Sequence, residues 1–103
     1  MTVLVLEDNK ESRRALGELL HKISDEIEVE LTATKEEALD VLDRSDDIDL
    51  FLLDINLNIR DDSNMAGLEF AKEIRERQNY AFTPVVFITS YADFEITSYR
   101  EAQ

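Results

Sequence analysis

Two kinds of hydrophobic spacing alternate along the chain. Some apolar runs are continuous or alternate with period two, which predicts strands, and most are continuous, as in strands buried on both faces of a parallel sheet. Others repeat at helical spacing and predict amphipathic helices. The predicted strands are residues 2–7, 27–33, 49–54 and 83–89, and the predicted helices are residues 10–24, 34–45, 65–78 and, with a weaker pattern, 93–103.

This alternation predicts an α/β fold with one doubly wound parallel sheet and a single domain over residues 1–103. Glutamates alternate with apolar residues in 27–33, so this strand is expected at an edge of the sheet. The strand at 83–89 is apolar on both faces, yet only one further helix is predicted after it. We therefore expect strand order 2-1-3-4 with a fifth strand missing, and an exposed last edge that favours a homodimer through the last strand and helix.

Composition narrows the function classes. The formal net charge is −13 at pH 7, which argues against direct nucleic-acid binding by this domain and suits a cation or a basic partner. The chain has no cysteine, no secretory signal pattern, and no apolar run long enough to span a membrane. We expect a cytoplasmic protein without membrane contact.

The candidate chemistry lies where predicted strands end. Glu7 and Asp8 follow the first strand, and Asp54 closes the third. In strand order 2-1-3-4 these two strands are neighbours, so the carboxylates converge at the ligand-binding edge of the sheet. Converging carboxylates repel one another, and oxygen ligands of this kind suit Mg²⁺. The backbone carbonyl of Asn56 could add an oxygen, and the Thr89 hydroxyl could bind an anion seated on Asp54.

Three segments in this order, "VLVLEDN", "FLLDIN" and "PVVFITS", resemble the receiver domain of response regulators from bacterial two-component systems. The resemblance covers essentially the whole chain and implies the flavodoxin-like receiver fold. It implies that Asp54 accepts a phosphoryl group from a sensor histidine kinase and that Thr89 hydrogen-bonds that group. It also implies Mg²⁺ bound by Glu7, Asp8, Asp54 and the carbonyl of Asn56. Such a domain is a phosphoacceptor rather than an enzyme, with at most slow self-phosphorylation and autodephosphorylation.

The segment "FITSYADFE" and the long loop after Asp54 are most similar to receivers of LytTR-type transcription regulators. Two features depart from the family pattern. The lysine that follows the fifth strand in the family has no counterpart here, and Gly67 follows Asp54 by thirteen residues rather than about eight. An alternative function is therefore a pseudo-receiver, an interaction module that works without phosphorylation. An EF-hand calcium loop at 54–58 is excluded, because Ile59 and Met65 replace the required Gly and Glu.

Overall fold

The computed structural model describes residues 1–55, 65–88 and 99–101. The four strands and three helices predicted up to residue 88 are all present, with bounds that differ from the predictions by at most two residues. The strands are β1 (Thr2–Leu6), β2 (Glu28–Thr32), β3 (Leu50–Asp54), β4 (Val85–Ile88) and β5 (Tyr99–Glu101). The helices are α1 (Lys10–Ile23), α2 (Lys35–Arg44), α3 (Met65–Glu76) and the short 3-10 helix η2 (Gln78–Tyr80).

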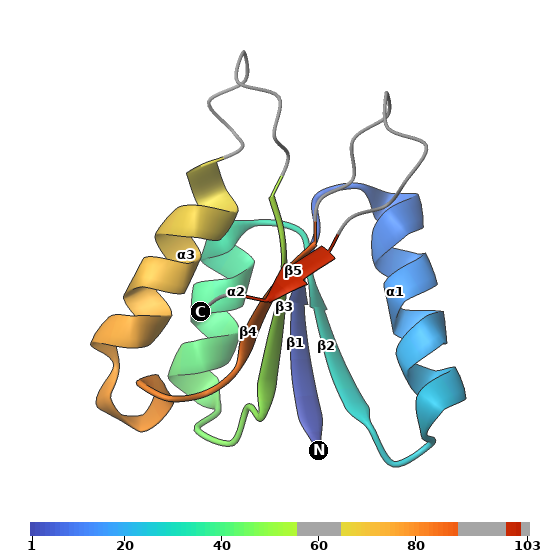
Figure 1. Ribbon diagram of the computed structural model, residues 1–103, viewed down its shortest axis with the longest axis horizontal. Helices are drawn as coiled ribbons and strands as arrows, with labels where there is room; N and C mark the ends of the chain where they lie inside the picture. The colour runs from blue at the N-terminus through green and yellow to red at the C-terminus, as the bar shows by residue number, and fades with distance from the viewer. Residues whose placement is uncertain (56–64, 89–98, 102–103) are drawn as a thin grey trace.

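The strands form one sheet in the order β2-β1-β3-β4-β5, in which β1 to β4 are parallel. Figure 1 shows α1 on one face of this sheet and α2 with α3 on the other. The order 2-1-3-4 of the parallel strands and the edge position of β2 are therefore confirmed. This is the flavodoxin-like, doubly wound arrangement, in which ligand sites form at the carboxyl ends of the strands.

The last part of the sheet differs from the sequence prediction. Residues 99–101 were expected to be helical, but they form strand β5, which pairs antiparallel with β4. The β4 edge on which the homodimer prediction depends is thus paired with β5, while no fifth parallel strand occurs in the described part of the chain. A three-residue segment with a weak helical pattern has little intrinsic preference, so the unpaired hydrogen-bonding groups of the β4 edge determine its conformation.

Helix α2 begins with a capping box. The Thr34 hydroxyl accepts a hydrogen bond from the backbone N–H of Glu37 at 3.1 Å. The Glu37 carboxylate in turn accepts from the backbone N–H of Ala33 at 2.7 Å, one residue earlier than in the usual motif. Within the described residues, no helix combines the length and the apolar character needed to cross a membrane.

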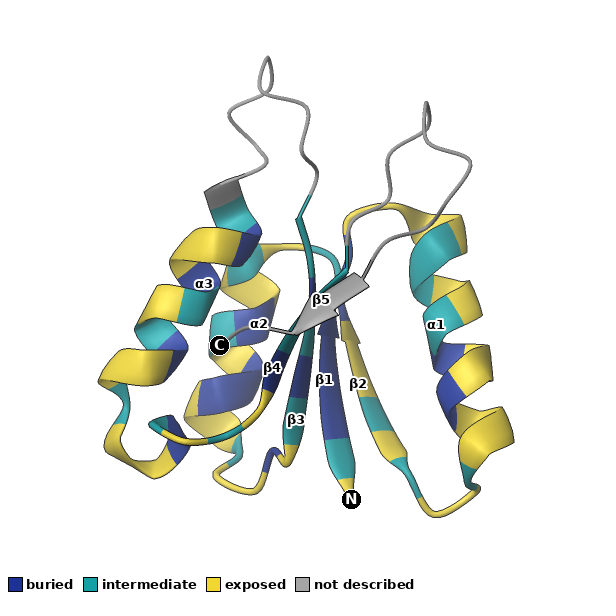
Figure 2. Cartoon of the chain, viewed as in Figure 1, coloured by how far each residue is buried: buried dark blue, intermediate teal, exposed yellow. Residues whose placement is uncertain are grey.

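The sheet separates two hydrophobic clusters, and β1 contributes to both. Leu4 and Leu6 pack with β3, α2 and α3, whereas Val3 and Val5 pack with α1. Figure 2 shows the central strands as the most buried part of the chain. Because β1 is buried on both faces, its carboxyl end is held firmly in place, and the polar residues that follow it start from a fixed position.

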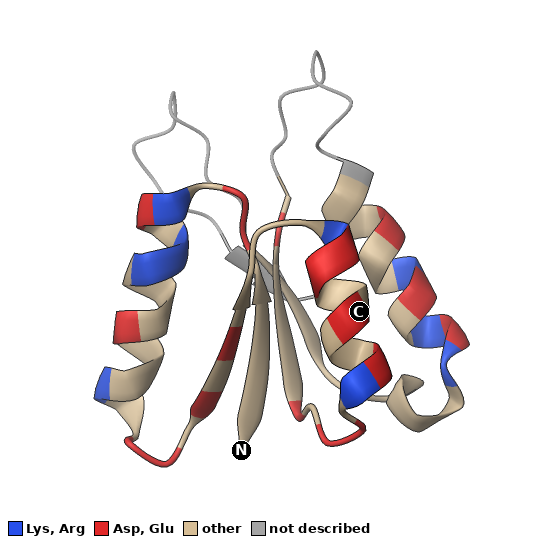
Figure 3. Cartoon of the chain, turned by 180° about the vertical axis from the view of Figure 1, so that it is seen from behind, with Lys and Arg blue, Asp and Glu red and all other residues tan. Residues whose placement is uncertain are grey.

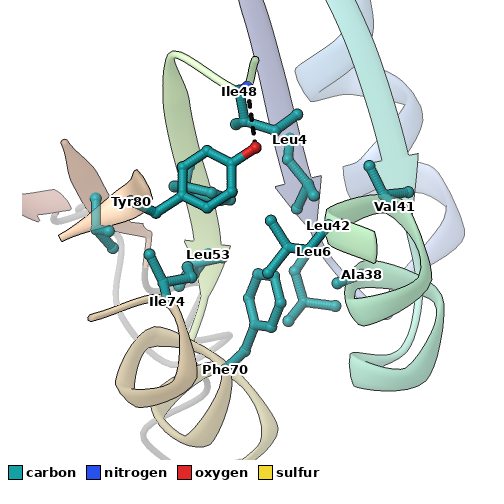
Figure 4. Packing of buried hydrophobic residues seen from close by; sticks show 12 residues of the cluster. Leu4, Leu6, Ala38, Val41, Leu42, Ile48, Leu53, Phe70, Ile74 and Tyr80 are labelled. Atoms are coloured by element: carbon teal, nitrogen blue, oxygen red, sulfur yellow. Dashed lines mark hydrogen bonds between the residues drawn. The ribbon is translucent and has the colours of Figure 1, made fainter. Parts of the chain in front are cut away.

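Tyr80, in η2, belongs to the larger cluster and packs near Ile48 (Figure 4). It is 1% exposed, and its ring packs edge-on against Phe51 with centroids 5.4 Å apart. Its hydroxyl accepts from the N–H of Ile48 at 3.3 Å and donates to the carbonyl of Ser45 at 3.0 Å. The buried phenol is therefore satisfied at both hydrogen-bonding positions, and it connects η2 to the segment between α2 and β3.

Candidate functional site

Three carboxylates meet at the carboxyl edge of the sheet. Leu6 in β1 is paired with Leu53 in β3, so the next residues along each strand, Glu7 and Asp54, lie side by side. One carboxylate oxygen from each of Glu7, Asp8 and Asp54 lies within 4.8 Å of the others. Glu7 is 2% exposed, Asp54 is half-buried and Asp8 is exposed. Figure 3 shows acidic residues at this edge, at the ends of the central strands. The predicted convergence of these residues is present in the structure.

The turn between β1 and α1 is built from local hydrogen bonds. The Glu7 carboxylate accepts from the backbone N–H of Asn9 at 3.0 Å, and the Asn9 side chain caps α1 by accepting from the N–H of Ser12 at 2.9 Å. Arg13 reaches back from the first turn of α1 and donates from Nη1 to the carbonyl of Glu7 at 2.9 Å and to that of Asp8 at 3.4 Å. Hydrogen bonds within the turn and from the Arg13 side chain therefore fix the backbone that carries the two acids.

Burial and mutual repulsion disfavour the charged forms of these carboxylates. Burial raises the pKa of Glu7 from its ordinary value of 4.5 to about 8, the Asn9 hydrogen bond opposes this, and the charge of Asp54 adds to it. Burial likewise raises the pKa of Asp54; hydrogen bonding with Glu7 opposes this shift, and the charge of Asp8 adds to it. The fold thus brings together carboxyl groups whose charged forms are disfavoured, an arrangement typical of functional sites.

A divalent cation fits the donor set. Asp54 Oδ1 is buried and has no hydrogen-bond partner among the described residues, which is costly for a carboxylate oxygen without a compensating ligand. The three carboxylates offer only oxygen donors, the ligand type that Mg²⁺ prefers, and the exposed Asp8 leaves the site accessible to solvent. The residues present therefore match Mg²⁺ in charge and in chemistry.

Gly67, in the first turn of α3, lies against the backbone of Asp54. A β-carbon at this position would stand 2.6 Å from the carbonyl oxygen of Asp54 and 3.3 Å from Cγ2 of Ile55. Only a glycine allows this approach, because the first contact is closer than non-bonded carbon and oxygen atoms come in proteins. The residue thus lets α3 support the end of β3 directly beneath the acidic cluster.

Two predicted site residues, Asn56 and Thr89, lie outside the described residues, and so do Asp61 and Asp62 of the long acidic loop. The roles predicted for Asn56 and Thr89 stay predictions. Sequence reasoning did not identify Arg13 as part of the site. A basic residue five positions after an acid pair, in the first turn of a helix, is a signal that could have pointed to it.

We expect the stability of the cation-free protein to fall as pH rises. Unfolded Glu7 ionises near pH 4.5 and folded Glu7 near pH 8, so unfolding releases a proton between these values and the unfolding free energy declines across this window. The decline should be on the order of a few kcal/mol, since one pKa unit corresponds to about 1.4 kcal/mol. Urea unfolding in EDTA at pH 5, 6, 7 and 8 measures it. Glu7→Gln should flatten the dependence; an equal slope in both proteins would contradict the assignment.

The structure defines the class of protein, a doubly wound α/β domain with three clustered carboxylates at the ends of β1 and β3. The family model of the response regulator receiver domain matches residues 3–102, and the chain belongs to this family. It is therefore a receiver domain of two-component signalling, from a family that interacts with histidine kinases, generally binds Mg²⁺ at an acidic pocket, and typically transmits signals without being enzymatic. Among curated proteins, none matches the chain significantly.

Solved structures agree with the family assignment. The N-terminal domain of a response regulator/sensory box/GGDEF three-domain protein from Carboxydothermus hydrogenoformans is 26% identical, with a TM-score of 0.70 over 95% of this chain and 71% of that one. A fusion that carries the yeast Spc42 trimeric coiled coil is 28% identical, with a TM-score of 0.69 over 90% of this chain, which spans 56% of that chain.

A third structure is similar in fold. It is a signal receiver domain of two-component signal transduction (histidine kinase) from Clostridium thermocellum, 22% identical with a TM-score of 0.69 over 91% of this chain and 70% of that one. At this identity the likeness concerns the fold alone.

Proposed function

We propose that Asp54 is the phosphoacceptor of this receiver domain and that its phosphoryl donor is the phosphohistidine of a sensor histidine kinase. The observation that carries the proposal is the convergence of the Glu7, Asp8 and Asp54 carboxylates within 4.8 Å, with Asp54 Oδ1 buried and unpartnered among the described residues. A native fold does not gather such groups without a cation or a chemical use for them. Family membership supplies the reaction class.

Each residue of the proposed site has a role that follows from its position. A carboxylate oxygen of Asp54 forms the new O–P bond as the P–N bond to the kinase histidine breaks, and the imidazole leaves with the electron pair and takes up a proton. Glu7, Asp8 and Asp54, with the carbonyl of Asn56, would hold Mg²⁺, and the Thr89 hydroxyl would hydrogen-bond the phosphoryl group. When bound, the cation neutralises charge on the phosphoryl oxygens.

Switching follows from the charge that the phosphoryl group adds, close to −2 at neutral pH. We propose that this charge attracts the Thr89 hydroxyl and changes the face near β4, which carries the output. The similarity of the "FITSYADFE" segment to LytTR-type receivers implies a role in transcription regulation. This segment lies largely outside the described residues, so the role is part of the proposal.

Intact mass spectrometry tests the phosphoacceptor role. The native polypeptide that contains residues 1–103 is incubated with Mg²⁺ and acetyl phosphate, and an acid-labile phosphoryl adduct is expected. Peptide mapping after borohydride reduction should place it at Asp54. If the native polypeptide forms no adduct with either acetyl phosphate or a phosphorylated kinase, the proposal fails. The alternative hypothesis, a pseudo-receiver interaction module, is then favoured.

A further inference from the structure

The Arg13 side chain donates hydrogen bonds to the backbone carbonyl groups of Glu7 and Asp8. Its Nη1 donates to the carbonyl oxygen of Glu7 at 2.9 Å and to that of Asp8 at 3.4 Å, and its own N–H donates to the carbonyl of Asn9 at 2.9 Å. One half-buried side chain therefore joins the first turn of α1 to both residues that precede the helix. No other long side chain among the described residues makes a hydrogen bond to these two carbonyls.

These contacts constrain the direction of the two carboxylates. Glu7 is held on its strand side by a backbone bond from its N–H to the carbonyl of Thr32 at 3.0 Å, and on its side chain by the N–H of Asn9. Asp8 is exposed, and the Arg13 bond to its carbonyl is the one hydrogen bond that holds its backbone among the described residues. Arg13 is therefore the group that restrains the peptide between Glu7 and Asp8, and with it the angle at which the Asp8 side chain leaves the turn.

We propose that Arg13 is a positioning residue of the acidic site, which holds Glu7 and Asp8 in the arrangement that binds a divalent cation. The inference rests on the proposed function, because it concerns the same cation site. A charge-assisted hydrogen bond from a guanidinium is about twice as strong as a neutral one, which suits a restraint on an exposed turn. The bonds go to carbonyls, so Arg13 holds the acids without neutralising either carboxylate by direct pairing.

The neighbouring Arg14 provides a matched control. It lies one position along the same helix, its side chain is 82% exposed, and it pairs with Glu18 at 3.5 Å on the helix surface. Arg13→Gln and Arg14→Gln remove the same charge and have nearly the same helix propensity. They differ in the contacts with the turn, so a difference between them measures those contacts.

Charge and position predict opposite results for Arg13→Gln. Removing a positive charge near a cation site should, by electrostatics alone, strengthen Mg²⁺ binding. Loss of positioning should instead weaken it, by roughly tenfold or more, as is usual when groups that orient metal ligands are removed. The sign of the change in Mg²⁺ affinity therefore separates the two effects.

Isothermal titration with Mg²⁺ alone gives the dissociation constants of the native chain, Arg13→Gln and Arg14→Gln, and circular dichroism checks folding. We expect Arg13→Gln to bind at least roughly tenfold more weakly than Arg14→Gln. Equal or tighter binding by Arg13→Gln overturns the inference and leaves the proposed function intact. Absence of Mg²⁺ binding by the native chain overturns the proposed site and this inference with it.

Lysine variants keep the test decisive if Arg13→Gln does not fold. Lysine keeps the charge but lacks the planar fork of donors, so Arg13→Lys should bind Mg²⁺ more weakly than Arg14→Lys, by a smaller factor than the glutamine pair. At saturating Mg²⁺, acetyl phosphate should phosphorylate Arg13→Lys as it does the native chain. Equal Mg²⁺ affinity in the two lysine variants would count against positioning.

Discussion

Asp54→Asn is expected to abolish the phosphoryl adduct and, at the same time, to stabilise the fold. The amide cannot serve as the nucleophile, so no adduct should form with acetyl phosphate and Mg²⁺. Asparagine also removes one of three like charges whose oxygens lie within 4.8 Å, two of which have pKa values raised by burial. The gain in unfolding free energy in EDTA at pH 8 should be about 1–2 kcal/mol.

Asp25→Asn is the matched control, because Asp25 is exposed in the turn between α1 and β2. This turn lies at the amino ends of the parallel strands, away from the acidic site at their carboxyl ends. The control variant should form the adduct normally and change stability by less than about 0.5 kcal/mol. Mass spectrometry and urea unfolding measure the two effects. An adduct that persists in Asp54→Asn would exclude Asp54 as the acceptor, and a loss of stability would show that its carboxylate is better satisfied than the structure indicates.

Gly67→Ala is expected to destabilise the protein and to slow phosphoryl acceptance strongly. Helix propensity alone predicts a gain of up to about 1 kcal/mol for this change. The added β-carbon, however, would stand 2.6 Å from the Asp54 carbonyl oxygen, a backbone atom that cannot move without displacing the end of β3. We expect a net loss of about 1–3 kcal/mol, as for other overpacked sites. The Asp54 carboxylate should shift with its backbone, so the adduct should form more slowly.

Gly17→Ala tests the same substitution where there is room to adjust. In α1 the new β-carbon would meet Cδ1 of Leu31 at 3.3 Å, the end of a flexible and 44% exposed side chain. This variant should be neutral or stabilised, with a normal rate of adduct formation. Thermal unfolding and the time course of adduct formation compare the two. If Gly67→Ala is as stable and as reactive as Gly17→Ala, the contact with Asp54 has no functional weight.

Much of the fold could be predicted from residue patterns because the relevant forces are local. The continuous apolar runs of β1, β3 and β4 and the helical spacing of α1 to α3 each appear within a short window of sequence, and the structure differs from them by at most two residues. Thr34 and Glu37 mark the start of α2 for the same reason, since a capping box acts within one turn. The β5 segment is the exception, because pairing with β4 outweighs a weak local helical pattern.

The acidic site was predictable in composition but not in detail. Glu7, Asp8 and Asp54 could be placed together because parallel strands end at a common edge, and the register of β1 with β3 satisfies that expectation. Arg13 was missed, since its role depends on a side chain that bends back to carbonyls five and six residues earlier. Such a bond depends on the angle at which the chain enters the helix.

The sequence by itself determined the order of elements up to β4, the parallel part of the sheet and the acids that follow its strands, because periodicity and strand ends are properties of neighbouring residues. Only the tertiary structure decided how far the carboxylates resist ionisation, which groups hold their turn, and how closely α3 approaches Asp54. Those properties depend on desolvation and on contacts between residues distant in sequence, such as Gly67 against Asp54. They arise when the elements pack together, and no local pattern encodes them.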